Sequence, residues 1–302
     1  MSLSAEILKT VILPLSGSKA MMADPSRLEA AALKSQSAGA SPPGLLLRRG
    51  VQVLESNETG THCFHCFPDG DSVATRVLYV HGGAYSLELA SYQWSIITDL
   101  VRRCGTPFHV PVFPLAPRHT WREAMDALLA IQAVLVQRDG PLVLMGDSSG
   151  AALALSLAQE LRARGDKGVD ALVLLSPALD YTFSAPESAE IAPHDPLLAQ
   201  AGPRWAAAAF SPTGDASDPA VSPLFGDFRG LPSLHLFGGT LDLTSPDAVR
   251  AHERAQAAGA LSYLRLYDDM PHVFMSASIP EAEECLGEIA RVLDEVERHA
   301  RP

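Results

Sequence analysis

Cysteine, positive charge and long apolar runs are all scarce in this chain. Its four cysteines in 302 residues do not form the pattern of a disulfide framework. Lysine and arginine together number 23 against 35 acidic residues, and the net charge of −12 disfavours binding to nucleic acid or anionic membranes. No apolar run is long enough to span a bilayer, and residues 1–6 lack the basic start of a signal peptide. We therefore expect a cytoplasmic protein with no stable membrane insertion and no nucleic-acid partner.

One cysteine pair has the spacing of a metal-binding knuckle. Cys63 and Cys66 flank Phe64 and His65, but a structural zinc site needs four ligands, and Cys104 and Cys285 do not supply a second pair. The alternative is a β-strand that carries two small hydrophobic side chains between turn signals. We favour the strand and expect neither a metal site nor a cofactor.

The remaining composition is that of an ordinary globular protein, with 47% apolar and 19% charged residues. The first 45 residues differ from the rest. Ile7, Val11, Ile12 and Leu15 have helical spacing, and a second helix is expected to begin at the Asp24–Pro25 pair. A linker of small residues follows at 37–44. This segment is too short for a core of its own, so we interpret residues 1–45 as an appended helical segment.

Strand and helix patterns alternate from residue 51 onward. A hairpin is expected from strands at 51–54 and 62–67, and further strands at 77–80, 109–113, 142–145, 171–175, 234–237 and 263–267. Helical patterns separate several of these, including 123–136. The alternation predicts an α/β fold with a mostly parallel sheet covered by helices on both faces. In such sheets the chemistry collects beyond the carboxyl ends of the strands.

A serine follows one of these strands directly. Ser148 lies in the pattern Gly146-Asp147-Ser148-Ser149-Gly150, between the apolar run 141–145 and an alanine- and leucine-rich helix. This is the spacing of a nucleophile elbow, in which small flanking residues allow a sharp strand-to-helix turn that exposes the serine hydroxyl. The turn also leaves N–H groups free at the helix N-terminus, where negative charge is stabilised.

The other strand ends supply partners for that serine. Gly82 and Gly83 follow the strand at 77–80 and can direct N–H groups into a cleft, while His81 before them is interpreted as structural. Asp242 follows the strand at 234–237, and His272 follows the strand at 263–267. Their order along the chain, Ser, Asp, His, is the order expected for a catalytic triad on this fold. Asp180 is a rival for the acid, because geometry and not position identifies it.

The chain resembles the hormone-sensitive-lipase-like carboxylesterases of the α/β-hydrolase superfamily. The resemblance runs from about residue 77 to the C-terminus and rests on the motifs at 81–84, 115–119, 146–150 and 218–224, together with Asp242 and His272. It implies an α/β-hydrolase fold in which residues 1–45 form an N-terminal helical cap, and residues 46–302 form the catalytic domain. It also implies a second cap insertion at about 184–209.

The resemblance further implies a serine carboxylesterase that hydrolyses small-molecule esters with short acyl chains. Ser148 would be the nucleophile, His272 the base and Asp242 the acid that orients it, with an oxyanion hole of N–H groups from Gly82, Gly83 and Ser149. Asp147 would support the elbow. Candidate pocket residues are Ala84, Tyr85, Trp205 and Phe210, although aromatic side chains at such positions are as often part of the core.

Three positions depart from the family pattern. Ala84 replaces the third motif glycine, Arg118 replaces an acid, and Ser149 stands where alanine is common. Two alternative functions stay open. One is a lactonase, carbamate hydrolase or amidase with the same triad. The other is a non-catalytic ligand receptor, which would typically have lost the catalytic histidine. The resemblance also allows a homodimer through the last strand and helix, which no residue requires.

Overall fold

Eight strands form a single sheet in the computed structural model, which describes residues 1–166 and 168–300. The strands are β1 (Val51–Ser56), β2 (Cys63–Pro68), β3 (Arg76–Val80), β4 (Phe108–Pro111), β5 (Leu142–Asp147), β6 (Ala171–Leu175), β7 (Ser233–Gly239) and β8 (Ser262–Tyr267). Their order across the sheet is β1-β2-β4-β3-β5-β6-β7-β8. Only β2 runs antiparallel to its neighbours, which confirms the predicted mostly parallel sheet and the hairpin at its edge.

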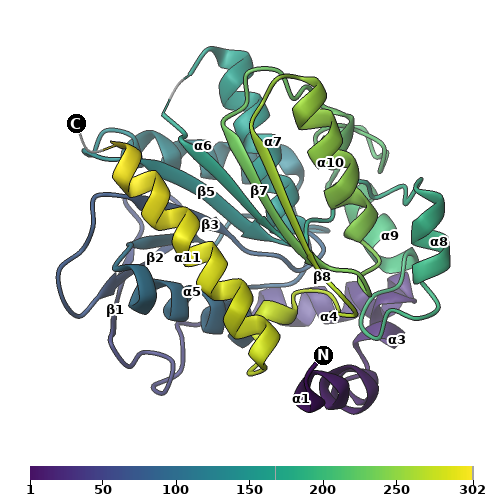
Figure 1. Ribbon diagram of the computed structural model, residues 1–302. Helices are drawn as coiled ribbons and strands as arrows, with labels where there is room; N and C mark the ends of the chain where they lie inside the picture. Colours follow the sequence, from purple (N-terminus) through teal and green to yellow (C-terminus); the bar gives the residue numbers. More distant parts are fainter. Residues whose placement is uncertain (167, 301–302) are drawn as a thin grey trace.

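Helices precede the sheet and connect its strands (Figure 1). They are α1 (Leu3–Ile7), α2 (Leu13–Leu15), α3 (Ser18–Met22), α4 (Pro25–Ala38), α5 (Ser91–Cys104), α6 (Trp121–Leu135), α7 (Ser149–Arg164), α8 (Pro186–Ile191), α9 (Ala201–Phe210), α10 (Ser245–Ala257) and α11 (Pro280–Ala300). A π-helical turn, η1 (Leu8–Ile12), joins α1 to α2, and η2 (Pro223–Phe225) and η3 (Phe274–Ser276) are 3₁₀ turns. None of the helices in the described residues is long and apolar enough to cross a membrane.

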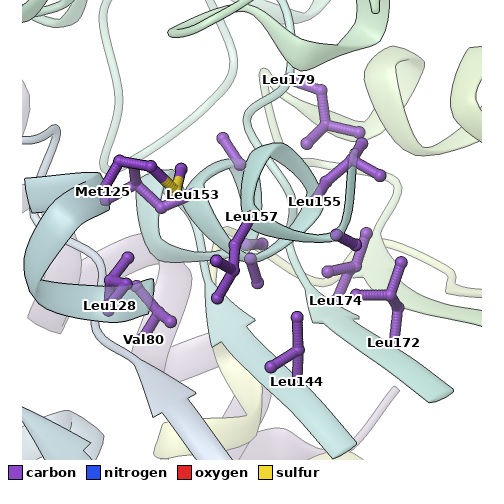
Figure 2. Close-up of a cluster of buried hydrophobic side chains, with 14 of the residues drawn as sticks. Val80, Met125, Leu128, Leu144, Leu153, Leu155, Leu157, Leu172, Leu174 and Leu179 are labelled. Atoms are coloured by element: carbon purple, nitrogen blue, oxygen red, sulfur yellow. The ribbon is translucent and has the colours of Figure 1, made fainter. Parts of the chain in front are cut away.

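Two apolar cores pack against opposite faces of the sheet. Helices α6, α7 and α10 cover one face, and α5 and α11 cover the other (Figure 1). Leucines of α7, among them Leu153 and Leu157, interleave with Leu144 and Leu172 of the central strands (Figure 2). Because parallel strands are buried on both faces, β3, β5 and β6 are apolar at nearly every position. The nucleophile elbow lies at the end of β5, a buried strand in the middle of the sheet.

The N-terminal segment lies beyond the carboxyl ends of the parallel strands (Figure 1). The Asp24 side chain accepts hydrogen bonds from the N–H groups of Ser26 and Arg27, so α4 begins where the sequence predicts. Helices α3 and α4 pack on α9, which lies between β6 and β7 in the chain. The helical spacing at 7–15 also corresponds to helix, but its apolar side chains are exposed, with Leu15 at 81%.

Two buried histidines make the folded chain sensitive to acid. Burial lowers the pKa of His81 to about 4 and that of His109 to about 3. The Nδ1 atom of His109 lies 2.7 Å from Nδ1 of His65, and β4 and β2 pair there. Both groups take up protons in the unfolded chain near pH 6.5 and in the folded chain only at much lower pH.

At these two sites the unfolded state binds more protons than the folded state below about pH 6.5, so the stability that both histidines contribute falls with pH from there down to about pH 3. The buried Asp247, whose pKa burial raises to about 8, contributes with the opposite sign. We expect the contribution of the histidines, measured by urea titration between pH 4 and pH 8, to decrease by an amount on the order of several kcal/mol as the pH falls. His109→Gln should make this slope shallower. An unchanged slope in that variant would exclude His109 as a source of the acid sensitivity.

Candidate active site

Ser148 lies in a strained turn between β5 and α7. Its backbone has φ 54° and ψ −122°, a conformation that L-residues rarely adopt and that directs the side chain away from the sheet. Gly146 and Gly150 allow this turn because no side chain fits at either position. A Cβ atom on Gly146 would lie 2.7 Å from the Val80 carbonyl oxygen and 2.5 Å from the backbone of Gly150.

The loops after β7 and β8 bring an acid and a histidine to this serine. His272 Nε2 lies 2.9 Å from Ser148 Oγ, and His272 Nδ1 lies 2.9 Å from Asp242 Oδ2. The other oxygen of Asp242 accepts hydrogen bonds from the N–H and hydroxyl of Thr244, both at 2.8 Å. Burial acts to lower the pKa of His272, but the negative charge of Asp242 and its hydrogen bond outweigh burial, and the pKa is raised.

The rival acid Asp180 lies elsewhere, and so does the nearby Asp247. Asp180 accepts hydrogen bonds from Thr182 and Ser184 and pairs with Arg250 at 2.8 Å, so its carboxylate organises its own turn. The side chain of Asp247 accepts the N–H groups of residues 179 and 180. In the described part of the chain, Asp242 is the carboxylate that contacts His272.

The loop after β3, residues 82–85, is expected to donate N–H groups to a ligand, and we call it the donor loop. One of its expected donors is not available. The Gly82 N–H donates to Oδ1 of the buried Asp147 at 2.9 Å, so it is not available to a ligand, and the choice of Gly82 is corrected. Three N–H groups beside Ser148 make no hydrogen bond within the described residues: those of Gly83, Ala84 and Ser149. Gly83, Ala84 and Ser148 line the same cavity.

Asp147 and Ser149 hold this loop in place. Besides Gly82, Asp147 accepts hydrogen bonds from the hydroxyl of Tyr79 at 2.8 Å and from the side-chain amide of Gln93. The Ser149 hydroxyl accepts the Tyr85 N–H at 3.1 Å, which makes it an anchor for the loop. Consecutive positive φ values at Ala84 (52°) and Tyr85 (58°) carry the loop past the elbow.

His81 takes no part in this arrangement. Its Nδ1 lies 2.8 Å from the Gly82 carbonyl oxygen, and its ring stacks on Phe113 with centroids 4.5 Å apart.

The two cysteines with knuckle spacing, Cys63 and Cys66, lie in the predicted strand. Both are buried in β2, where burial raises the pKa of each thiol to about 12.

A cavity of about 290 Å³ opens beside Ser148 and His272. Its wall is mostly apolar, and no Asp, Glu, Lys or Arg of the described chain lines it. One part of the wall comes from α2 and α3, the other from the segment between α8 and α9 and the start of α9: Leu13, Ser18, Met21, Met22, Leu197, Leu198, Ala199 and Pro203. Sequence reasoning missed these residues, because their helical patterns carry no mark of a ligand.

Only one of the four expected pocket residues lines this cavity. Ala84 does, but Tyr85 and Phe210 stack on each other in the core with centroids 4.9 Å apart, and the Tyr85 hydroxyl donates to the Val221 carbonyl oxygen. Trp205 packs against the small apolar cluster around Met22. The pocket prediction is corrected at these three aromatic positions, which fill space between elements.

Comparisons with known proteins agree with this fold. Residues 77–276 match the model of a family described as having the α/β-hydrolase fold. The chain is 34% identical to an esterase of Acinetobacter venetianus, over 72% of this chain and 74% of the relative. It is 27% identical to an acetyl-hydrolase of Streptomyces hygroscopicus, over 66% of this chain and 67% of the relative.

Among solved structures, a hormone-sensitive lipase from a metagenome library superposes with a TM-score of 0.76 at 25% identity, covering 91% of this chain and 98% of the other. The chain therefore belongs to the α/β-hydrolase family, as a carboxylic ester hydrolase of the hormone-sensitive-lipase-like group.

Proposed function

We propose that the protein hydrolyses small neutral esters through an acyl-enzyme intermediate on Ser148. The observation that carries the proposal is the pair of 2.9 Å contacts that link Ser148, His272 and Asp242 at the mouth of an apolar cavity. A serine hydroxyl becomes an effective nucleophile when a neighbouring base removes its proton during attack. The His272 Nε2 atom has the distance required of that base.

In the proposed reaction, Ser148 Oγ attacks the ester carbonyl carbon while its proton passes to His272 Nε2. The proton then moves to the leaving alcohol, and the carbon–oxygen bond breaks to leave an ester on Ser148. Water, deprotonated by the same nitrogen, attacks this ester. The bond between the acyl carbon and Ser148 Oγ then breaks, His272 Nε2 returns the proton to Oγ, and the acid is released. Asp242 holds the ring with Nδ1 protonated and stabilises the charged imidazolium that forms in each half of the cycle.

The oxyanion of each tetrahedral intermediate is assigned to the free N–H groups of Gly83, Ala84 and Ser149. Backbone donors that need no reorganisation stabilise the developing charge, and the loss of one such donor typically costs about 3 kcal/mol in the transition state. Asp147 serves this hole indirectly, because it fixes the loop of Gly82 against the elbow. The Ser149 hydroxyl is assigned no chemical role.

The cavity favours small, uncharged substrates. About 290 Å³ behind an apolar wall has room for a short acyl or alcohol group, and a charged group would lose its hydration there without a partner. The name acetyl-hydrolase, carried by the Streptomyces relative, is in keeping with a short acyl chain. We propose that α2 to α4 and the region of α8 and α9 act as the two cap elements, because both contribute wall residues.

A fluorophosphonate probe and an ester panel test these two parts separately. We expect one covalent adduct per chain, which fragmentation of the labelled peptide places on Ser148 and not on Ser149. A series of p-nitrophenyl esters from acetate to decanoate should give its highest kcat/KM at the short end, above matched lactone, carbamate and amide substrates. An unlabelled protein would refute the serine mechanism, and a preference for decanoate would refute the substrate assignment.

A further inference from the structure

A second buried carboxylate lies behind the loop that carries Asp242. Asp195 follows α8 and is fully buried. One of its oxygens accepts the N–H of Leu243 at 2.7 Å, and the other accepts the N–H groups of Leu197 and Leu198 at 2.7 and 2.8 Å. Leu243 directly follows Asp242 in the chain. A single side chain thus connects the loop of the triad acid to the cavity wall.

This carboxylate has no cation of its own. Its three hydrogen bonds come from backbone N–H groups, and no Lys, Arg or His side chain forms an ion pair with it in the described residues. Burial, and next the negative charge of Asp242, raise the pKa of Asp195. A buried anion beside another anion is costly, so stability alone does not account for an acid at this position.

The N-terminal segment holds the turn that carries Asp195. Lys19, at the start of α3, donates through Nζ to three backbone carbonyl oxygens in that turn: Ala192 at 3.0 Å, Pro193 at 3.1 Å and Asp195 at 2.6 Å. Lys19 therefore fixes the backbone of Asp195 and leaves its carboxylate charge uncompensated.

We propose that Asp195 is a positioning residue for the triad, which holds Asp242 against His272 through the Leu243 N–H and adds negative charge behind the acid. The proposal rests on the function assigned above to Ser148, His272 and Asp242. Restraint of Leu243 limits the movement of the neighbouring Asp242, whose carboxylate must stay aligned with the imidazole ring throughout the reaction.

The charges around His272 are consistent with this role. Three carboxylates act on it from different loops: Asp242 from the loop after β7, Asp195 from the turn after α8, and Asp147 from the end of β5. Burial works in the opposite direction. The negative charge of Asp195 favours the imidazolium form that exists after the proton leaves Ser148.

The substitution Asp195→Asn tests the proposal. The asparagine oxygen can still accept from Leu197 and Leu198, but its NH₂ group then faces the Leu243 N–H, and the charge is gone. We expect kcat for p-nitrophenyl acetate to fall by about tenfold or more, with KM little changed. Because the pKa of His272 should decrease, the acid limb of the kcat/KM–pH profile should move to lower pH.

The matched control is Asp180→Asn, since Asp180 is another buried carboxylate that accepts backbone and hydroxyl hydrogen bonds in a turn after β6. It should lower the melting temperature and leave the acid limb in place. A folded Asp195→Asn enzyme with wild-type kcat and an unmoved acid limb would overturn the proposal. If that enzyme is still labelled at Ser148, the proposed esterase mechanism stands and only the role of Asp195 fails.

A second variant tests the role of the Asp195 turn if Asp195→Asn does not fold. Lys19→Met breaks the contacts to the Asp195 turn without a change in the triad, and Lys34→Met on the exposed side of α4 is its control. We expect faster hydrogen exchange at the Leu243 amide and a lower kcat in Lys19→Met only. Wild-type exchange and wild-type kcat in Lys19→Met would refute the link from this turn to the triad.

Discussion

Ser148→Ala is expected to lower kcat for short p-nitrophenyl esters by about 10⁶-fold, since loss of a triad nucleophile removes the function of the whole triad. Without Oγ no acyl-enzyme forms, and His272 has no proton to accept at 2.9 Å. The free N–H groups of the donor loop and the apolar cavity remain, so weak residual catalysis over water is expected. Steady-state kinetics and fluorophosphonate labelling measure the two consequences independently.

Ser156→Ala is the control for this change. Ser156 lies on α7, two turns after the elbow, and accepts a hydrogen bond from Trp121 Nε1 at 3.1 Å. It is buried and does not line the cavity, so its loss should affect stability by about 1 kcal/mol and leave kcat unchanged. Comparable kcat values in Ser148→Ala and the wild type would show that the hydrolysis proceeds at another site.

Asp242→Asn is expected to lower kcat by about 10⁴-fold while the protein stays folded. In the wild type, Oδ2 accepts the proton on His272 Nδ1 at 2.9 Å. An asparagine NH₂ in that position donates instead, and the ring must then carry its proton on Nε2. That nitrogen can no longer accept the proton of Ser148, so the defect is one of tautomer and not of geometry.

Asp180→Asn distinguishes this explanation from a general effect of removing a buried charge. Asp180 pairs with Arg250 at 2.8 Å and makes no contact with His272. Activity close to wild type is expected, and loss of the ion pair should show only in the melting temperature. Should Asp180→Asn and Asp242→Asn lose the same amount of activity, Asp242 would not be the orienting acid.

The fold was predictable because local signals and the tertiary structure agree. The Asp24–Pro25 pair starts a helix whether or not the rest of the chain is present, and the apolar runs of β3, β5 and β6 require burial on two faces. The order of the strands across the sheet, in which β4 lies between β2 and β3, does not follow from these local signals. The exposed positions of the N-terminal helix, Leu15 above all, do not follow from its spacing.

The residue types of the site could be predicted from the sequence, but which of its backbone N–H groups are free to bind a ligand could not. A Gly-Gly pair after β3 indicates donors, yet which N–H group is free depends on Asp147, 65 positions away, which occupies that of Gly82. Side-chain type likewise cannot separate a pocket aromatic from a core aromatic. Tyr85 and Phe210 stack in the interior because a tyrosine hydroxyl can reach a carbonyl oxygen there, here that of Val221.

The cavity wall has a consequence for how the enzyme can change over evolution. Part of the wall comes from α2, α3 and the segment before α9, none of which belongs to the sheet or carries a triad residue. Mutations at Met21, Met22 or Leu197 can therefore reshape the space for the acyl or alcohol group while the reacting atoms keep their positions. Side-chain changes at these three positions are therefore expected to alter which esters fit the cavity, whereas changes at Asp195 or Lys19, which join the wall to the Asp242 loop through polar contacts, are expected to alter the rate at which a bound ester reacts.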